Sequence, residues 1–130
     1  MLRKINADQA LTIAVECHPD ARFAGDRDDL AEMLGNLMDN ACKWARSQVR
    51  VSAGTGPSLA VTVEDDGPGL TEAQQAEATR RGARLDENAP GHGLGLAIVG
   101  DLAALYGGRL ALHRSSLGGL AARLEFHQKV

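Results

Sequence analysis

The chain has 130 residues, of which 44% are apolar and 24% are charged, and this size and balance are typical of one globular domain. A formal net charge of -3 argues against nucleic-acid binding, which favours clustered lysine and arginine. No run approaches the roughly 18 consecutive apolar residues of a transmembrane helix, and the first residues lack the apolar core of a signal peptide. We therefore expect residues 1–130 to form a single soluble domain.

The two cysteines, Cys17 and Cys42, lie in different surroundings, with no CxxC pattern and no cluster of cysteine and histidine nearby. We interpret both as reduced thiols that are buried as small apolar side chains, with a metal site or a disulfide as the alternative. Reduced thiols favour a cytoplasmic location.

The first third of the chain predicts a strand and then a long helix. Residues of the β type run from 11 to 16, and the segment 19–25 has the composition of a turn. Asp26 is a suitable N-cap, and Asp28 in the first turn would favour the helix dipole. The helical pattern continues to about Arg46.

The middle of the chain predicts a hairpin and a short helix. Two β-type runs, 49–53 and 59–64, are separated by a turn and suit an antiparallel pair. Thr71 could cap a short helix that continues to about Arg80. Residues 82–93 are rich in turn-forming residues and lack an apolar period, so we expect a mobile loop.

The last part of the chain predicts another long helix and two strands. The helix would run over 94–106 and end at Gly107-Gly108, before strands at 109–114 and 120–127. In this order the elements indicate an α+β fold, with a mixed, mostly antiparallel sheet and helices packed on one face.

The first predicted helix has two distinct faces. At about 100° per residue, its broad apolar face consists of Leu30, Met33, Leu34, Leu37, Met38, Ala41, Trp44 and Ala45. Asn36, Asn40 and Lys43 follow the opposite arc at the i, i+4, i+7 spacing, which is either a solvated face or a site. Asparagine is a poor helix former, yet its carboxamide oxygen suits Mg²⁺, and a lysine can serve a phosphate. The arc is therefore equipped for a metal-bound polyphosphate.

Asp65 opens a glycine-containing segment that runs to Gly69, directly after a predicted strand. The glycines allow close approach of the backbone. A carboxylate accepts a hydrogen bond from an exocyclic amino group, which adenine carries at position six and guanine lacks, so Asp65 could select ATP over GTP. The alternative is an acidic β-turn with no ligand.

A second glycine-rich segment, residues 91–96, precedes the later helix. Its backbone N–H groups and the helix dipole could bind an anion such as a triphosphate, although glycine-rich turns before helices are common. The segment is not a Rossmann signature, because no strand precedes it, and it lacks the lysine ending of a Walker A motif.

In this order, the segment 36–43, Asp65-x-Gly-x-Gly and Gly91-x-Gly-x-Gly resemble the N, G1 and G2 boxes of the GHKL ATPases. The resemblance covers nearly the whole chain. The chain looks most like the catalytic domain of a bacterial sensor histidine kinase, which has the Bergerat two-layer α/β sandwich and takes ATP and Mg²⁺.

The resemblance implies roles for individual residues. Asn40 would ligate Mg²⁺, Asn36 and Lys43 would attend the phosphates or the metal as the catalytic residues, and Asp65 would bind the adenine amino group. The implied nucleotide-binding set also contains Gly67, Gly69, Gly91, Gly93, Leu94, Gly95 and Leu96.

Asn36 bears on the type of reaction. Hydrolytic relatives carry a glutamate general base at this position, four residues before the metal-binding asparagine, and an amide cannot take a proton from water. Phosphotransfer is therefore favoured over hydrolysis. The sequences of the segments 39–44, 64–69 and 81–84 resemble the PhoQ type of sensor kinase. This resemblance would place Trp44 beside the adenine, with packing in the core as the alternative.

Two features depart from the family pattern. Residues 71–91 contain no aromatic residue where the family usually has its F box, so a lid there would pack differently. Arg81 and Arg84 remain as candidate phosphate contacts, or as solvated side chains. The second departure is that no histidine lies in the context of a phosphoacceptor helix, among His18, His92, His113 and His127.

The leading hypothesis is therefore an ATP-dependent histidine kinase domain that acts on a histidine of a separate dimerisation domain. Expected partners are that domain and a response regulator, and no nucleic acid. The parent would be a homodimeric inner-membrane sensor with this part in the cytoplasm, and the isolated domain a monomer. An anti-sigma-factor serine kinase of the same fold, or a nucleotide-binding module without phosphotransfer, remains as an alternative.

Overall fold

The computed structural model describes residues 11–55, 58–79 and 94–127. Its elements in chain order are β1 (Thr12–Cys17), α1 (Arg27–Trp44), β2 (Gln48–Gly54), β3 (Ser58–Asp65), α2 (Glu72–Thr79), α3 (Leu94–Leu105), β4 (Gly108–Arg114) and β5 (Leu120–His127). These elements agree in kind and order with those predicted, and their ends differ by one or two residues. The predicted loop at 82–93 lies outside the described residues.

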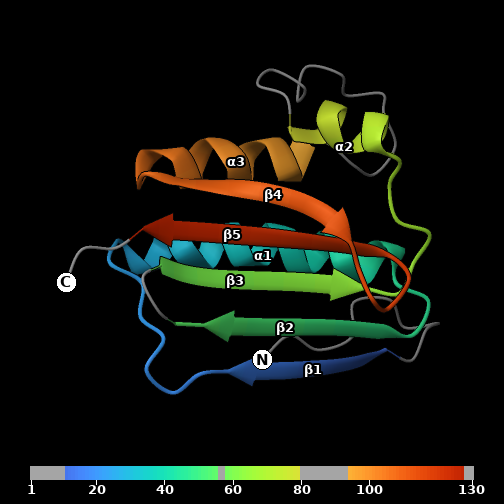
Figure 1. Cartoon of the computed structure of the whole chain (residues 1–130), viewed down its shortest axis with the longest axis horizontal. Coiled ribbons are helices and arrows are strands. Elements are labelled where there is room, and N and C mark those ends of the chain that lie inside the picture. The colour runs from blue at the N-terminus through green and yellow to red at the C-terminus, as the bar shows by residue number, and fades with distance from the viewer. Residues whose placement is uncertain (1–10, 56–57, 80–93, 128–130) are drawn as a thin grey trace.

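The five strands form one sheet in the order β1-β2-β3-β5-β4 (Figure 1). β1 and β2 pair in parallel, and the other neighbours pair antiparallel. A parallel pair needs a crossover connection, and α1 provides it between β1 and β2. The sheet is therefore mixed and mostly antiparallel, as the sequence predicts.

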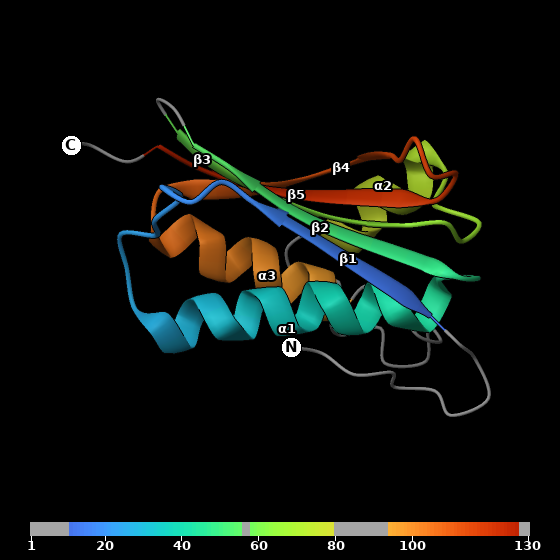
Figure 2. The same cartoon turned by 90° about the horizontal axis from the view of Figure 1, so that it is seen from below.

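α1 and α3 cover one face of the sheet and leave the other uncovered (Figure 2). Inward residues of β3, such as Leu59, Val61 and Val63, are buried against this helical layer together with Met33 and Leu37 of α1. The arrangement is the predicted two-layer α+β sandwich. None of the described helices combines the length and the apolar character that a membrane span requires.

Side chains define both ends of α1. The Asp26 carboxylate caps the first turn by accepting from the N–H of Asp28 at 2.7 Å. At the other end the helix stops at Trp44, two residues earlier than predicted. The N–H of Ala45 still donates to the carbonyl of Ala41 at 2.8 Å, but the two N–H groups after it bond elsewhere. Those of Arg46 and Ser47 donate to the carboxylate of Asp66, at 2.8 and 3.0 Å.

The two cysteines lie in different environments. Cys42 belongs to α1 and is buried in the core, and burial, together with the charge of Asp39, raises the pKa of its thiol. Cys17 is exposed, so the prediction that both thiols are buried is wrong for Cys17. It ends the edge strand β1, whose residues are mostly exposed because the helical layer does not extend over them.

Candidate nucleotide-binding site

A cavity of about 290 Å³ opens where the carboxyl end of β3 meets the helices. α1, α2, α3 and β5 all contribute to its wall, so segments from most of the chain meet here. The lining residues are Asn40, Trp44, Asp65, Pro68, Gly69, Leu70, Gln74, Leu96 and Leu120. Six of these nine residues belong to the predicted motifs. Most of the wall is apolar, which suits a flat organic ring.

Asp65 is the acidic residue in this wall. Its position follows from the two-residue period of β3, which puts it on the same face as Val61 and Val63, and it is only 2% exposed. The carboxylate oxygen Oδ1 accepts from the N–H of Gly67 at 2.9 Å and of Leu120 at 3.3 Å. Within the described residues no donor bonds to Oδ2, so this oxygen is available to a ligand.

Burial raises the pKa of the Asp65 carboxyl. The two N–H donors from Gly67 and Leu120 lower it in part, and the charge of Asp66 adds to the rise. A partly desolvated carboxylate with a free oxygen is a strong acceptor for an N–H group of a bound molecule. The arrangement therefore favours a ligand that brings a donor to an apolar pocket.

Asp66 has a structural role instead. Its side chain lies away from the cavity and accepts from the N–H groups of Arg46 and Ser47 and from the Ser47 hydroxyl. Partial burial opposes its charged form, but the hydrogen bonds from Ser47, Gln48 and Arg46 outweigh burial and hold the pKa well below its usual range. Asp66 thereby joins the end of α1, which carries Asn40, to the turn after β3.

Gly67 and Gly69 shape the turn beside Asp65. A Cβ at Gly67 would overlap the carbonyl oxygen of Trp44, so only glycine lets the turn approach the end of α1 this closely. Gly69 lines the cavity itself. Both glycines therefore lie where the sequence places them, next to the predicted base-binding carboxylate.

Only part of the polar arc of α1, which consists of Asn36, Asn40 and Lys43, lines the cavity. Asn40 lines the cavity, and its side chain makes no hydrogen bond within the described residues. Asn36 lies outside the lining, and its amide donates to the carbonyl of Glu32 at 3.0 Å. Lys43 is exposed and also lies outside the lining. Trp44 is half-buried and lines the cavity.

The second glycine segment is described only from its end. Leu94 and Gly95 form the first turn of α3, and Leu96 lines the cavity while its side chain is 1% exposed. The predicted Gly91 and Gly93 lie outside the described residues. The same holds for Arg81 and Arg84, the candidate phosphate contacts.

Three lining residues were not predicted. Leu70 follows the glycine turn, and Gln74 belongs to α2, where it exchanges hydrogen bonds with the capping residue Thr71. That reciprocal capping pattern was readable from the sequence and would have placed Gln74 in the first turn of α2. Leu120 comes from β5, and only the pairing of β3 with β5 brings it to Asp65.

The described residues around the cavity include few side chains that could coordinate a metal ion. Among the described residues there is no group of three or more histidine, cysteine, aspartate or glutamate side chains that could hold one. Asn40 lies in the cavity wall, and its carboxamide carries a neutral oxygen of the type that can coordinate a hard cation. Such a site fits Mg²⁺, which commonly takes one or two protein ligands and completes its shell with water and phosphate oxygens.

A mostly apolar cavity with one buried carboxylate in its wall has the features of a small-molecule binding site. Comparison with known proteins identifies the family to which the domain belongs. Residues 25–130 match the family described as Histidine kinase-, DNA gyrase B-, and HSP90-like ATPase, and the chain therefore belongs to this GHKL family.

Its relatives are sensor kinases. The sensor protein kinase CarS of Pseudomonas aeruginosa is 49% identical over 116 residues, which are 88% of this chain and 26% of CarS. The sensor protein PhoQ of Escherichia coli is 37% identical over 125 residues, 95% of this chain and 25% of PhoQ. The chain thus spans a minor part of the length of these relatives.

A solved structure supports the same assignment. Full-length ShkA in complex with AMPPNP matches with a TM-score of 0.74 and 28% identity, over 92% of this chain and 26% of ShkA. The predicted resemblance to the catalytic domain of sensor histidine kinases, including the PhoQ type, is confirmed. This chain is an ATP-binding domain of the kind that sensor kinases carry.

Proposed function

We propose that this chain binds Mg²⁺-ATP in the cavity and donates the γ-phosphate to a histidine on a separate domain of a two-component sensor kinase. The observation that carries the proposal is the buried Asp65 carboxylate, which keeps one oxygen free in an apolar cavity. The related ShkA was solved in complex with AMPPNP, an ATP analogue, which supports nucleotide binding by a protein that contains a domain of this fold.

The adenine end is assigned to Asp65 and the apolar wall. Asp65 accepts from the exocyclic amino group of the base, and the pocket provides Trp44, Leu70, Leu96 and Leu120 as contacts for the ring. Hypoxanthine has a carbonyl oxygen at that position, which would meet the carboxylate as a second acceptor. The site therefore distinguishes adenine from hypoxanthine and guanine.

The phosphate end is assigned to the polar arc of α1. Asn40 would hold Mg²⁺, which supplies positive charge to the triphosphate, and Asn36 and Lys43 would attend the phosphates. The remaining phosphate contacts are assigned to the glycine segment and the two arginines before it, which are Arg81, Arg84, Gly91, Gly93, Leu94 and Gly95. Backbone N–H groups at the start of α3 suit an anion.

The reaction transfers a phosphoryl group. A histidine ring nitrogen of the acceptor domain attacks the γ-phosphorus, the bond from phosphorus to the β–γ bridging oxygen breaks, and ADP leaves with that electron pair. Asn36 cannot act as a base toward water, which favours the histidine as acceptor over hydrolysis. The protein contributes positioning and charge neutralisation.

The partners follow from the relatives. CarS and PhoQ are sensor kinases, and this chain spans only part of their length. We assign it to the cytoplasmic part of a homodimeric inner-membrane sensor, where it acts on a dimerisation domain with the acceptor histidine. A response regulator then receives the phosphoryl group.

Asp65→Asn tests nucleotide binding. Trp44 is the single tryptophan of the chain and lines the cavity, so its fluorescence reports the titration with AMPPNP directly. We expect the affinity for AMPPNP to fall about 10- to 100-fold. The NH₂ group of asparagine can face the adenine amino group, and two donors do not form a hydrogen bond. Unchanged affinity in a folded variant would refute the adenine assignment.

Phosphotransfer is tested with the purified chain, ATP and the histidine domain of its parent kinase. We expect a phosphoprotein that is labile in acid and stable in base, as phosphohistidine is. An acid-stable product on a serine substrate would replace the proposal with a serine kinase. Binding of AMPPNP without transfer to either acceptor would leave a nucleotide-binding module.

A further inference from the structure

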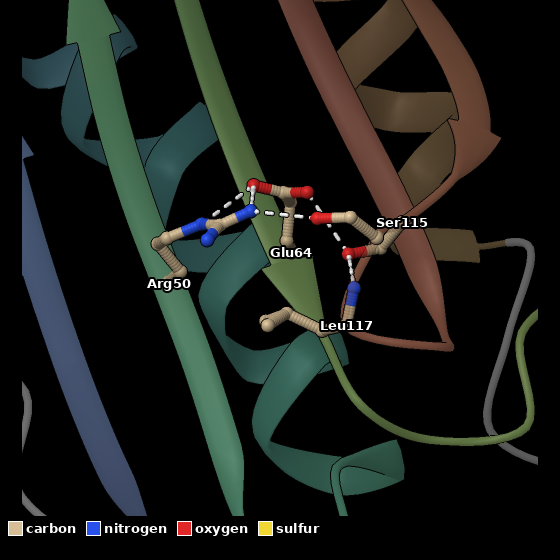
Figure 3. A network of polar contacts seen from close by, with 5 residues as sticks. Arg50, Glu64, Ser115 and Leu117 are labelled. Atoms are coloured by element: carbon tan, nitrogen blue, oxygen red, sulfur yellow. Dashed lines mark hydrogen bonds and ion pairs between the residues drawn. The ribbon is translucent and has the colours of Figure 1, made fainter.

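A polar network surrounds Glu64, the residue before Asp65, and includes Arg50 and Ser115 (Figure 3). Glu64 precedes Asp65 in β3, so its side chain lies on the sheet face that the helices leave uncovered. Glu64 is still buried there, with only 9% of its surface exposed. Glu64 Oε1 accepts from Arg50 of β2 at 2.9 Å. Glu64 Oε2 accepts from the hydroxyl of Ser115, at the end of β4, at 2.9 Å.

Ser115 organises the turn between β4 and β5. Its buried hydroxyl donates to Glu64 and also accepts from the N–H of Leu117 at 2.9 Å. The Ser115 N–H donates to the carbonyl of Gly119 at 2.8 Å, and the Gly118 N–H donates to the carbonyl of Ser115 at 3.0 Å. These bonds hold the turn in one shape and anchor it to β3.

The far end of the same turn bonds to Asp65. The Gly119 N–H donates to the Asp65 carbonyl at 3.1 Å, and the Leu120 N–H donates to the Asp65 carboxylate at 3.3 Å. A Cβ at Gly119 would overlap that carboxylate, so the turn approaches Asp65 as closely as a backbone can. Leu120 also lines the cavity.

We propose that the Glu64–Ser115 pair positions the Asp65 carboxylate for adenine, by holding the turn that supplies one of its two N–H donors. Glu64 and Ser115 are positioning residues, because they contact the turn and not the ligand. This inference rests on the proposed function for the role of Asp65, and extends it to residues on the opposite face of the sheet.

The electrostatics of the pair favour a fixed geometry. A buried carboxylate is costly unless it is paired and hydrogen-bonded, and Glu64 has both the Arg50 guanidinium and the Ser115 hydroxyl. Arg50 also donates to the hydroxyl of Ser116 at 3.2 Å. Loss of the Ser115 hydroxyl would leave one oxygen of Glu64 and the N–H of Leu117 without these partners, so the turn would shift or loosen.

The test uses Ser115→Ala, with Ser115→Thr as the conservative variant that keeps a hydroxyl. Glu125→Gln is a matched control, because Glu125 lies on the same face and pairs with Arg109 and Arg123 but not with the turn. For each variant, AMPPNP and the corresponding inosine analogue are titrated by Trp44 fluorescence. Carboxyl ¹³C NMR follows the titration of Asp65 without nucleotide.

In Ser115→Ala we expect AMPPNP affinity to fall about 3- to 10-fold and the preference over the inosine analogue to fall with it. The pKa of Asp65 rises further, because a donor that stabilises its charge is weakened while the Asp66 charge remains. Ser115→Thr restores both properties, and Glu125→Gln changes neither.

Ser115→Ala with wild-type nucleotide preference and wild-type Asp65 titration would overturn the inference. Equal loss of affinity for both analogues, with no change in the titration, would overturn it too, because only general stability would then be affected. If circular dichroism shows that Ser115→Ala does not fold, Glu64→Gln undergoes the same two measurements. If the wild-type chain binds neither analogue, the proposed function fails, and the Asp65 titration alone still decides whether the turn positions Asp65.

Discussion

The two ends of the sandwich differ in how their aromatic side chains are used. At one end the ring of Phe23 packs edge-on against Tyr106 and Phe126, with centroids 5.1 and 5.0 Å apart. At the other end Trp44, the remaining aromatic residue, lines an open cavity. Phe126 and the cavity residue Leu120 lie six positions apart on β5, about 20 Å for an extended strand.

Polar groups follow the same division. At the aromatic end the Tyr106 hydroxyl donates to Asp29 and accepts from the N–H of Asp26, so the start of α1 is tied to the end of α3. At the cavity end Asp65 and Asn40 retain hydrogen-bonding capacity within the described residues. The side chains of the aromatic end bond to one another, whereas those of the cavity end keep donors and acceptors that a ligand can use.

Phe126→Ala should have the largest effect on stability and little effect on binding. Phe126 is 1% exposed, and removal of a buried phenyl ring lowers the free energy of unfolding by about 3–5 kcal/mol. Urea unfolding followed by circular dichroism measures this change, and AMPPNP affinity is measured well below the unfolding midpoint. Leu105→Ala is the control, because Leu105 is 77% exposed and should lose less than about 0.5 kcal/mol. If Phe126→Ala lowers the free energy of unfolding by less than about 1 kcal/mol, the result would contradict tight packing at the aromatic end.

Asn40→Ala should have the next largest effect, and on binding alone. We expect Mg²⁺-dependent AMPPNP affinity to fall about tenfold, as for the loss of one ligand to a charged group. Asn36→Ala is the comparison, because Asn36 lies on the same arc but its amide donates to a carbonyl of its own helix. We expect Asn36→Ala to lose less affinity for AMPPNP than Asn40→Ala. Equal losses in both variants would show that the whole arc, and not only its cavity-lining part, contacts the nucleotide.

Asp66→Asn should have the smallest effect and should depend on pH. The folded-state pKa of Asp66 is depressed, so its carboxylate stabilises the fold above the unfolded pKa of about 3.9, and this stabilisation is lost as pH falls toward the folded value. We expect the variant to be less stable by about 1 kcal/mol at pH 7, since water screens a half-exposed group. The difference should persist to about pH 4 and shrink below it. Urea midpoints at pH 7, 5, 4 and 3 measure it, and a constant difference would exclude the titration of Asp66 as its cause.

The elements of the fold were predictable because their signals are local. The Asp26 cap and the alternation of Leu59, Val61 and Val63 lie within single segments, and each produced the expected helix or strand. The end of α1 was predicted two residues late, since a side chain 20 positions away takes the N–H of Arg46. Cys17 was misjudged because burial of an edge strand depends on how far the helical layer extends.

The candidate site was predictable in part. Asp65, Asn40 and Trp44 belong to short motifs, and the structure brings all three to one cavity. Leu120 carries no local signal of its role, because it joins the site only through the pairing of β5 with β3.

The sequence by itself determined the order of elements, the polar arc of α1 and the glycine turns, since periodicity and turn chemistry depend on neighbours along the chain. Only the tertiary structure decided that Asp65 faces the cavity with a raised pKa while Asp66 faces the end of α1 with a lowered one. Burial and hydrogen-bond donors set these two shifts. The donor to Asp65 from Leu120 and the donors to Asp66 from Arg46, Ser47 and Gln48 are distant in sequence, so adjacent identical side chains acquire different roles.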